Sequence, residues 1–398
     1  MLDVLIVGAG PAGSVAGALL ARAGARVRIV DRAAFPRDKL CGDTVNPGTL
    51  ARLQALNLAS GIDERSLRVD GMRLTGEAGV TIEGRYPVRL SGRAITRRDL
   101  DWVLLQQAIA AGCEFESGIA VRRASVMEQG ATRSVSGAVV GGGGRESSIA
   151  ARVTIAADGR HSTIAFGLRL GMHPRRPRRW AIGAYFENFM PDGVRRGSVP
   201  HPDPRLTPSS YGEMHVRRAH YIGVAPVPGG LTNVCLVKPS GAADPELADP
   251  SALLIRTLAA DPLLRDRAAG ARLIAPPTVL GPLAVDVRDE PIDGLLLAGD
   301  AAGFIDPMTG DGLRFAVHGA ELAAAAARRA LEHGWSGVHQ GLSGERRRAF
   351  AGKWRFNRAL RTLVSSPRGV EAAARGAWIA PAVFHSIIAR AGDCSLAC

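Results

Sequence analysis

Lysine is nearly absent from this sequence, which has 50 Lys and Arg residues but lysine only at Lys39, Lys238 and Lys353. Arginine therefore carries the formal net charge of +13. Aromatic residues are also scarce, at 5% of the chain, and no basic stretch is interleaved with the stacking aromatics that nucleic-acid binding uses. We therefore expect no nucleic-acid partner and interpret most of the charge as arginine on solvated surfaces.

Cysteine is limited to five widely spaced residues, and no pair has the short spacing of a metal site. We predict no metal centre, and this cysteine usage indicates a reducing cytoplasm. The chain also lacks an apolar run of about 18 residues and a basic, cleavable leader, so neither a transmembrane helix nor a signal peptide is predicted. With 398 residues, 46% of them apolar, it is long enough for two or three domains.

The first 31 residues have the pattern of one strand–helix–strand unit. Residues 4–8 form a short apolar run typical of a buried parallel strand. Residues 11–24 are rich in Ala and Leu and end on glycine, which predicts a helix. Residues 26–31 predict a second strand that ends in Asp31. The turn between the first strand and the helix reads Gly8-Ala9-Gly10-Pro11-Ala12-Gly13.

This glycine turn predicts a dinucleotide site. Gly8 permits a tight turn, Gly10 lets the backbone approach a pyrophosphate, and Gly13 lets helix and strand pack closely. Free amides at the helix start then face the phosphates. Asp31, placed 23 residues after Gly8, is expected to bond the ribose hydroxyls. The alternative is a purely structural glycine-rich turn, and the motif alone does not separate NAD from FAD.

Two later segments favour FAD. Residues 294–299 predict a buried strand that ends at Gly299-Asp300, where the carboxylate can bond a ribityl hydroxyl. Gly310, Gly312 and Leu313 begin a predicted helix over residues 310–332, whose amides can face the N1–C2=O edge of the flavin ring. The alternative for Asp300 is an ordinary helix-capping or turn residue. The second of these two later segments is a strand-end turn at Asp158-Gly159.

The stretch between these segments has a different character. About residues 170–285, Pro and Gly are frequent and short β-like runs alternate with turns, which predicts an antiparallel sheet. The tail from about residue 340 is rich in arginine and helical in pattern. The predicted fold is therefore α/β, a three-layer ββα Rossmann-type domain with an inserted antiparallel-sheet domain and a helical tail. The expected boundaries are 1–70, 91–170 and 285–332 for the nucleotide domain, 71–90 and 171–284 for the substrate domain, and 333–398 for the tail.

Together the three turns resemble the FAD-dependent superfamily of p-hydroxybenzoate hydroxylase, geranylgeranyl reductases and flavin-dependent halogenases. The segment Phe35–Asp43 (FPRDKLCGD) is similar to one in the geranylgeranyl reductase-like branch. The resemblance implies that Arg97 lies near the FAD phosphates and that Val121 meets the adenine. The full set of cofactor residues expected from the motifs and the resemblance is Gly8, Gly10, Ala12, Gly13, Asp31, Arg32, Cys41, Gly42, Thr44, Arg97, Val121, Asp158, Gly159, Gly299, Asp300, Pro307, Gly310, Gly312 and Leu313.

One segment departs from the family pattern. Geranylgeranyl reductases carry YxWxFP along the lipid site, and this chain has Tyr221-Ile222-Gly223-Val224-Ala225-Pro226. Gly223 and Ala225 replace two large aromatics, which leaves space or reshapes the pocket. Halogenation is disfavoured because it needs a lysine between flavin and substrate, and no lysine falls in a suitable place.

Reduced flavin can pass a hydride to a double bond or activate oxygen for hydroxylation, and the residues do not decide between them. The superfamily favours an NAD(P)H-driven monooxygenase of secondary metabolism, acting on an aromatic, polyketide-like or lipid-like small molecule. The alternative is a geranylgeranyl reductase-like enzyme that reduces carbon–carbon double bonds. Candidate catalytic residues are Tyr211, His215 and Tyr221. Arg217 and Met308 are further pocket candidates, and packing is the alternative role for each.

Two other classes of function stay open. A nicotinamide-dependent dehydrogenase would use the N-terminal unit alone and would leave Gly299-Asp300 unexplained. A basic membrane-surface protein would use the tail, including Arg346-Arg347-Arg348, to contact anionic lipid.

Overall fold

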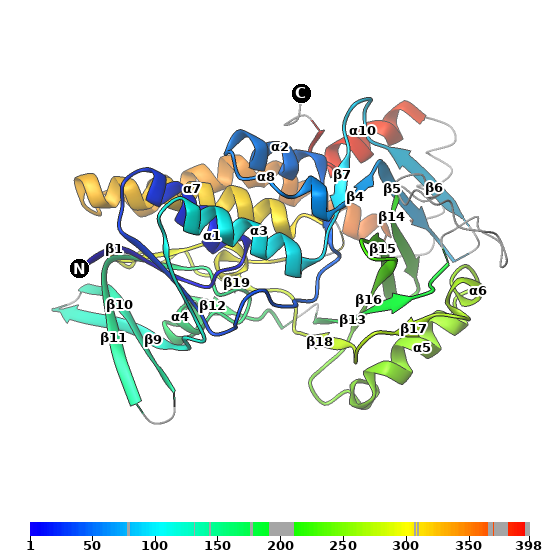
Figure 1. Cartoon of the computed structure of the whole chain (residues 1–398), viewed down its shortest axis with the longest axis horizontal. Coiled ribbons are helices and arrows are strands. Elements are labelled where there is room, and N and C mark those ends of the chain that lie inside the picture. Colours follow the sequence, from blue (N-terminus) through cyan, green and yellow to red (C-terminus); the bar gives the residue numbers. More distant parts are fainter. Residues whose placement is uncertain are drawn as a thin grey trace.

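The computed structural model describes residues 1–77, 80–130, 132–142, 145–175, 178–190, 211–305, 308, 310–364, 369 and 381–394. They form an elongated molecule with two lobes, each built on one large sheet (Figure 1). The N-terminal lobe contains the glycine turn, and the other contains most of the middle of the chain.

The sheet of the first lobe has the strand order β8-β2-β1-β11-β10-β9, with β20 beside β11. Its parallel part contains β1 (Leu2–Val7), β2 (Val27–Asp31), β8 (Glu114–Ser117), the end of β11 (Arg145–Ala156) and β20 (Leu295–Leu297). The strands β9 (Val121–Gln129) and β10 (Thr132–Gly142) join β11 in an antiparallel ribbon. Because β20 pairs with β11, the Gly299-Asp300 turn lies at the same sheet edge as the glycine turn.

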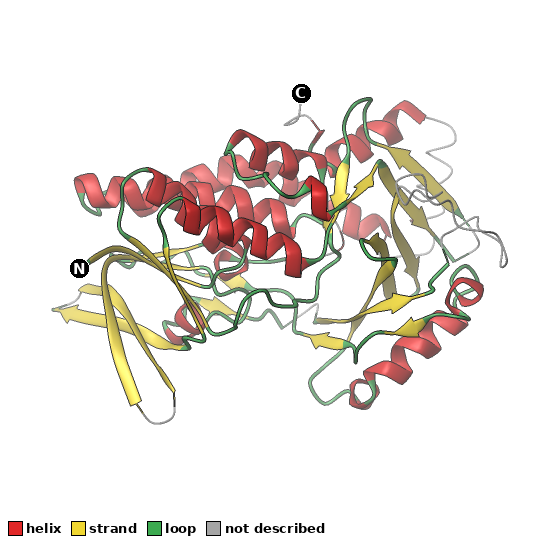
Figure 2. Cartoon of the chain, in the orientation of Figure 1, coloured by secondary structure: helices red, strands yellow, loops and turns green. Residues whose placement is uncertain are grey.

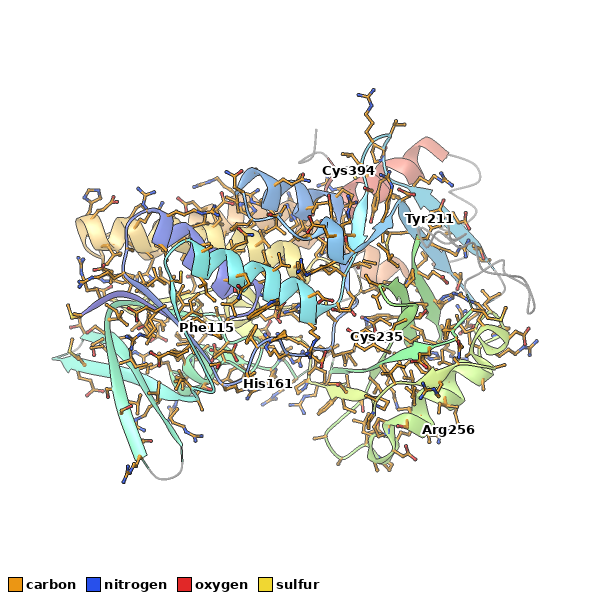
Figure 3. All side chains as sticks on the ribbon, viewed as in Figure 1. Phe115, His161, Tyr211, Cys235, Arg256 and Cys394 are labelled. Atoms are coloured by element: carbon orange, nitrogen blue, oxygen red, sulfur yellow. The ribbon has the colours of Figure 1, made fainter. Side chains whose placement is uncertain are left out.

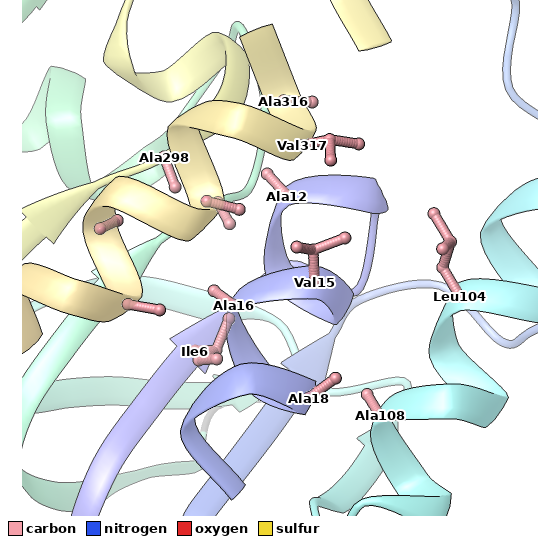
Figure 4. Packing of buried hydrophobic residues seen from close by; sticks show 14 of the residues in the cluster. Ile6, Ala12, Val15, Ala16, Ala18, Leu104, Ala108, Ala298, Ala316 and Val317 are labelled. Carbon is pink, nitrogen blue, oxygen red and sulfur yellow. The ribbon is translucent and has the colours of Figure 1, made fainter. Parts of the chain in front are cut away.

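Small side chains allow three helices to pack tightly on one face of this sheet (Figure 2). Ala12 and Val15 of α1 (Pro11–Arg22) lie against Ala316 and Val317 of α7 (Gly312–His333), and Ala18 lies near Ala108 of α3 (Arg97–Ala110) (Figure 4). Burial of these apolar side chains stabilises the lobe. The fold is the predicted Rossmann-type architecture, and α2 (Pro47–Ala55) and α8 (Val338–Val364) extend its helical layer.

The second lobe has the strand order β17-β13-β16-β15-β14-β5-β6, with β18 beside β13. It is antiparallel except at the pair β14–β5. Its back face is covered by α5 (Pro250–Ala260) and α6 (Arg265–Ala268), and its front face is turned toward the first lobe. The strands are β5 (Gly71–Thr75), β6 (Thr81–Arg85), β13 (Arg179–Glu187), β14 (Tyr211–Arg217), β15 (His220–Val227), β16 (Leu231–Pro239), β17 (Arg272–Leu273) and β18 (Thr278–Leu280).

Short elements connect the lobes. A three-stranded sheet joins β3 (Thr44–Val45), β7 (Gly92–Ala94) and β4 (Leu67–Val69), and β12 (Gly171–Met172) pairs with β19 (Asp286–Val287). Short helices are η1 (Asp63–Arg65), α4 (Thr163–Gly167), η3 (Pro245–Ala248) and η4 (Gly299–Ala302). Near the C-terminus, α10 (Pro381–Ala391) lies beside β6 (Figure 1).

Because β5 and β6 belong to the second sheet, we propose that residues 71–90 and 171–284 form a domain inserted into the first one. Within the described part of the chain, none of the helices combines the length and the hydrophobicity that a membrane crossing requires.

Candidate functional site

A deep cleft runs between the two lobes and encloses about 1030 Å³ of empty space, including the part open to solvent. Its walls come from segments far apart in the sequence, since residues of the glycine turn, of the 39–44 loop, of η4 and of the start of α7 face the front of the second sheet across it. Figure 3 places Cys235, one of the lining residues of that sheet, between the two lobes.

The glycine turn has the geometry that its motif predicts. Gly8 has φ of 101°, and a side chain there would lie 2.5 Å from the carbonyl oxygen of Ala157. A Cβ at Gly13 would lie 1.8 Å from the carbonyl oxygen of Gly8, so only glycine fits where α1 crosses β1. Gly10, in contrast, borders the open cleft. Asp31 ends β2 beside this turn and accepts the Ala9 amide at 2.9 Å.

Two arginines, the buried Arg97 and the half-buried Arg37, stand next to the turn and share one carboxylate. Arg97 forms a bidentate ion pair with Asp101 at 2.7 and 2.8 Å, and Arg37 Nη2 lies 3.1 Å from Asp101 Oδ2. The Nη1 atom of Arg37 is buried and has no hydrogen-bond partner in the described structure. A Cβ at Gly10 would lie 3.6 Å from Arg37 Nη2. An unpaired guanidinium nitrogen beside an open backbone turn suits an anionic ligand such as a pyrophosphate.

Two more cations, Lys39 and Arg160, line the cleft. Burial, together with the charge of Arg97, lowers the pKa of Lys39, and burial lowers the pKa of Arg160 to about 10 against the opposing effect of Asp300. Burial disfavours a charged group unless an opposite charge accompanies it. An anionic ligand would therefore stabilise these side chains in their charged forms. Lys39 belongs to the segment that the resemblance expects near the flavin, and it lines the cleft.

The strand-end turns meet at the same edge of the first sheet. Asp300 lines the cleft from η4, directly after β20, and Gly312 and Leu313 line it from the first turn of α7. Gly159 lines the cleft too, whereas Asp158 is turned away and accepts the Thr163 amide at 2.8 Å. Asp158 therefore organises the start of α4 and positions the turn without bordering the cleft.

A buried polar trio anchors the loop between the cleft and the second sheet. Tyr185 Oη donates to Asp43 Oδ2 at 2.6 Å, and Asn233 Nδ2 donates to the same oxygen at 2.7 Å and to the carbonyl oxygen of Cys41 at 2.6 Å. Burial raises the pKa of Asp43 to about 7, although the hydrogen bond from Tyr185 and the charge of Arg97 oppose the rise. Asp43 is therefore a proton-holding group near neutral pH.

The front face of the second sheet is built from small residues at the positions where the resemblance implies aromatics. Gly223 pairs with Cys235, which pairs with Gly183, so the three form one row across β15, β16 and β13. A Cβ at Gly223 would meet nothing closer than 3.9 Å, which agrees with the predicted loss of bulk. Leu40 occupies the space above Gly183. Burial raises the pKa of the Cys235 thiol to about 12, so it is present as a thiol.

The prediction that Tyr211, His215 and Arg217 line the pocket was wrong. Side chains alternate between the faces of a strand, and these odd-numbered residues of β14 point to the back of the sheet. His215 is buried there between Glu213 and Thr75, at 3.0 and 2.8 Å, and Arg217 pairs with Asp261 at 2.6 Å. The Tyr211 hydroxyl accepts a hydrogen bond from Arg85 at 2.9 Å. Tyr221 does lie on the front face, packed among apolar neighbours of the cleft.

Most of the predicted cofactor residues border the cleft. Those that line it are Gly10, Ala12, Cys41, Gly42, Thr44, Arg97, Gly159, Gly299, Asp300, Gly310, Gly312 and Leu313. Those that support it from outside its lining are Gly8, Gly13, Asp31, Arg32, Val121 and Asp158. Val121 is half-buried at the start of β9 and packs on the far side of the sheet. Pro307 lies outside the described residues.

Sequence reasoning missed several residues of the site. Arg37, Lys39 and Asp43 stand in the segment that carries the resemblance, and Arg160 directly follows Asp158-Gly159, so their proximity to the motifs was the available signal. Tyr185 and Asn233 lie in the middle of strands with no motif around them. Arg346, predicted as part of a basic lipid-binding tail, instead donates to the carbonyl oxygen of Leu297 inside the protein.

A second cavity adjoins the cleft and shares Thr44 and Gly310 with it; it encloses about 910 Å³ of empty space, including the part open to solvent. Of the predicted pocket residues, Met308 lines this cavity. The other walls come from β3, β4, β5 and β14 and from the C-terminal helix α10, and they consist of Val45, Asn46, Val69, Met72, Arg73, Leu74, Tyr86, Met214, Ile387, Ile388 and Ala391.

The first part of the chain matches a family described as an FAD binding domain, over residues 1–188. Menaquinone reductases of two mycobacteria are similar. The one from Mycobacterium tuberculosis is 30% identical over 340 residues, covering 81% of this chain and 75% of that protein. The one from Mycolicibacterium smegmatis is 47% identical over 102 residues, which is 25% of this chain and 24% of that protein.

A digeranylgeranylglycerophospholipid reductase of Methanopyrus kandleri is 29% identical over 350 residues, covering 83% of this chain and 81% of that protein. Among solved structures, a flavin-dependent brominase superposes with a TM-score of 0.81 at 20% identity, covering 99% of this chain and 94% of that one. At that identity the likeness concerns the fold.

Proposed function

This chain belongs to the FAD-dependent oxidoreductases of the p-hydroxybenzoate hydroxylase superfamily, in its geranylgeranyl reductase-like branch, and from that premise we propose that it reduces a carbon–carbon double bond in an apolar substrate. The cleft fits FAD, since the open glycine turn and the unpaired Arg37 nitrogen suit a pyrophosphate, and the Asp300 carboxylate in the cleft lining suits a ribityl hydroxyl. Reduced FAD supplies a hydride when it is bound. NAD(P)H is the electron donor that we propose.

The observation that supports this proposal best is the chemistry of the second cavity. Its described lining contains no His, Lys, Asp or Glu, and its one charged residue, Arg73, is paired with Glu83 at 2.5 Å. A substrate would therefore be held there mainly by burial of apolar surface, at roughly 25 cal/mol per Å². The relatives named for menaquinone and for a geranylgeranyl phospholipid also act on large apolar molecules, which agrees with such a cavity.

The chain's own residues would orient the reactants and exclude water. Gly10, Arg37, Arg97 and Lys39 would hold the phosphates of the cofactor, and the first amides of α7 would face the ring. Reduction of a double bond also needs a proton, because a hydride adds to only one of the two carbons. Asp43 is a buried carboxyl between the cleft-lining residues Gly42 and Thr44 whose pKa burial raises to about 7, and we propose it as the proton reservoir.

The monooxygenase that the sequence favoured is the second candidate. It is supported by the superfamily as a whole, and one experiment separates the two reactions. The FAD-loaded protein is reduced with NADPH or NADH without oxygen and is then mixed with menaquinone or digeranylgeranylglycerophospholipid. We expect flavin reoxidation without oxygen and a product that has gained two hydrogen atoms at a carbon–carbon double bond of the chain, not at the quinone oxygens. Turnover only after air is admitted, with an oxygen atom in the product, would replace the reductase by the hydroxylase.

A further inference from the structure

Three exposed arginines gather where α8 meets α10. Arg348 and Arg355 lie seven residues apart on α8, which is about two helical turns, so both lie on the same face of this helix. Gly352 lies on that face between them. Arg390 of α10 reaches the same place, because its Nη2 atom would lie 3.6 Å from a Cβ at Gly352. We call Arg348, Arg355 and Arg390 the basic patch.

The charge of the basic patch is not offset by carboxylates. Among the described residues, none forms an ion pair with any of its three arginines. The sequence has neither Asp nor Glu between Glu345 and Glu371, a stretch that includes the C-terminal part of α8. Arg347 lies 3.8 Å from Asp289 and Arg346 donates to the backbone inside the protein, so neither belongs to the patch. Like charges held together repel one another until an anionic partner neutralises them.

A partly exposed tryptophan stands next to these arginines. Trp354 directly precedes Arg355 and is 36% exposed. Its ring centroid lies 5.9 Å from that of Phe350 and 6.3 Å from that of Phe315, so the two phenylalanines hold it at the surface of α7 and α8. Tryptophan is enriched at membrane–water interfaces, because its indole is apolar with one polar edge. A basic helix face with an exposed tryptophan is typical of a helix that lies on an anionic lipid surface.

We propose that the basic patch binds the phosphate groups of an anionic phospholipid surface. Guanidinium groups donate paired hydrogen bonds to phosphate oxygens, and each basic residue at such a surface raises affinity about fivefold. Nucleic acid fits less well, since single strands are bound by several stacking aromatics and Trp354 is the one exposed aromatic side chain in the described part of the chain. The patch lies outside the cleft, so this inference goes beyond the proposed function and does not depend on the reaction.

The test measures vesicle binding by the full-length, FAD-loaded chain without turnover. Sedimentation compares vesicles of phosphatidylcholine mixed with phosphatidylglycerol and vesicles of phosphatidylcholine alone. We expect salt-sensitive binding to the mixed vesicles and none to the neutral ones. The triple variant Arg348→Gln, Arg355→Gln and Arg390→Gln should bind the mixed vesicles at least about tenfold more weakly.

A matched control removes the same charge elsewhere. Arg145→Gln, Arg218→Gln and Arg256→Gln change three exposed arginines that form no ion pair among the described residues, and Figure 3 shows Arg256 in the second lobe. This variant should bind the mixed vesicles like the unmodified protein. Circular dichroism and FAD titration confirm that both triple variants are folded.

The position of the tryptophan gives a second readout. Tryptophan emission of the unmodified protein should shift to shorter wavelength on the mixed vesicles, and Trp354→Phe, which keeps an aromatic ring beside Phe315 and Phe350, should lose the shift. Equal loss of binding in the two triple variants would indicate attraction by net charge and would overturn the patch. So would a failure of the unmodified protein to bind the mixed vesicles. Patch-dependent binding to duplex DNA that is tighter than binding to vesicles would replace the lipid surface by nucleic acid.

Discussion

At the residue scale, the geometry of the glycine turn predicts a large effect of a single added methyl group. A Cβ at Gly13 would lie 1.8 Å from the carbonyl oxygen of Gly8, and neither backbone can move without displacing β1 or α1. Gly13→Ala should therefore abolish FAD binding, as measured by flavin fluorescence titration. Gly319 in α7 is the control, because nothing lies within 4 Å of a Cβ added there. Gly319→Ala should keep FAD affinity and raise stability by up to about 1 kcal/mol. Normal FAD binding by Gly13→Ala would refute the pyrophosphate role of this turn.

The carboxyl of Asp43 predicts a pH dependence of stability. Burial raises its pKa from 3.8 to about 7, so between these values the folded state holds a proton that the unfolded state releases. This group's contribution to stability therefore falls as pH rises through the window, by up to about 1.4 kcal/mol per pH unit. Asp43→Asn keeps a side chain that tolerates the local φ of 51° and should remove this slope.

The measurement is denaturant unfolding from about pH 5 to about pH 7, with the difference between variant and unmodified protein plotted against pH. Asp261→Asn supplies the control. Burial acts to raise the pKa of Asp261, but the hydrogen bonds from Arg217 and from the Leu263 amide, together with the charge of Arg217, outweigh it and hold the pKa below 3.8. Its difference curve should be flat over the same window. A flat curve for Asp43→Asn as well would show that Asp43 holds no proton at neutral pH.

At the scale of elements, the C-terminal helix is fastened to the flavin end of α7 by a buried ionic network. Lys353 of α8 donates to the carbonyl oxygens of Arg390 and Ala391 at 2.8 and 2.9 Å, and it pairs with Asp311 at 3.0 Å and Asp393 at 3.3 Å. Asp311 is the residue directly before α7, and Arg314 pairs with Asp393 at 2.7 Å. The wall of the second cavity and the N-terminal end of α7 are thus connected through one lysine.

Removal of that lysine leaves two buried carboxylates without their shared cation. Lys353→Met should lower the free energy of unfolding by about 3–5 kcal/mol. Amide hydrogen exchange should accelerate over residues 386–394 before it does so in β1 and β11, because the loss is local to the attachment of α10. Arg355→Met, at an exposed position of the same helix, should leave exchange unchanged. If both variants exchanged alike, the network would not be what holds α10.

The sequence predicts some of these features, namely those that depend on local residue patterns, and not those that depend on tertiary packing. The strand-end turns at Gly8, Asp158 and Gly299 were predictable, because each combines an apolar run with residues that a tight turn or a strand end requires. The orientation of β14 was not. Alternation shows that Tyr211 and His215 share a face, but only tertiary packing decides whether that face meets the cleft or α5.

The polar trio illustrates a second limit. Asp43, Tyr185 and Asn233 come from a loop and two separate strands, and their contacts depend on how two sheets approach one another. The second cavity is a third case, since Ile388 joins residues of β3 and β5 only after the chain has returned to the start of the molecule. Neither arrangement leaves a periodic signal in the sequence.

At the scale of the whole molecule, the cleft makes FAD a link between the lobes. Gly10, Asp300 and Leu313 line it from the first lobe, and Ala181, Cys235 and Leu280 line it from the second sheet. A ligand that binds only the folded state stabilises whatever must be folded to form its site, by about 2.7 kcal/mol at a hundredfold excess over Kd. Because both lobes form this site, bound FAD should increase the stability of both lobes.

We therefore expect FAD to slow amide exchange in β16 of the second lobe by as much as in β1 of the first. Asp300→Ala, which removes a carboxylate from the cleft without touching the second sheet, should reduce the gain in both strands together. The N-terminal family match covers only residues 1–188, and a cofactor held by that part alone would protect β1 and leave β16 unchanged. That outcome would mean that the second sheet borders the cleft without being stabilised by the cofactor. Substrates would then reach the flavin without the cofactor holding the two lobes together.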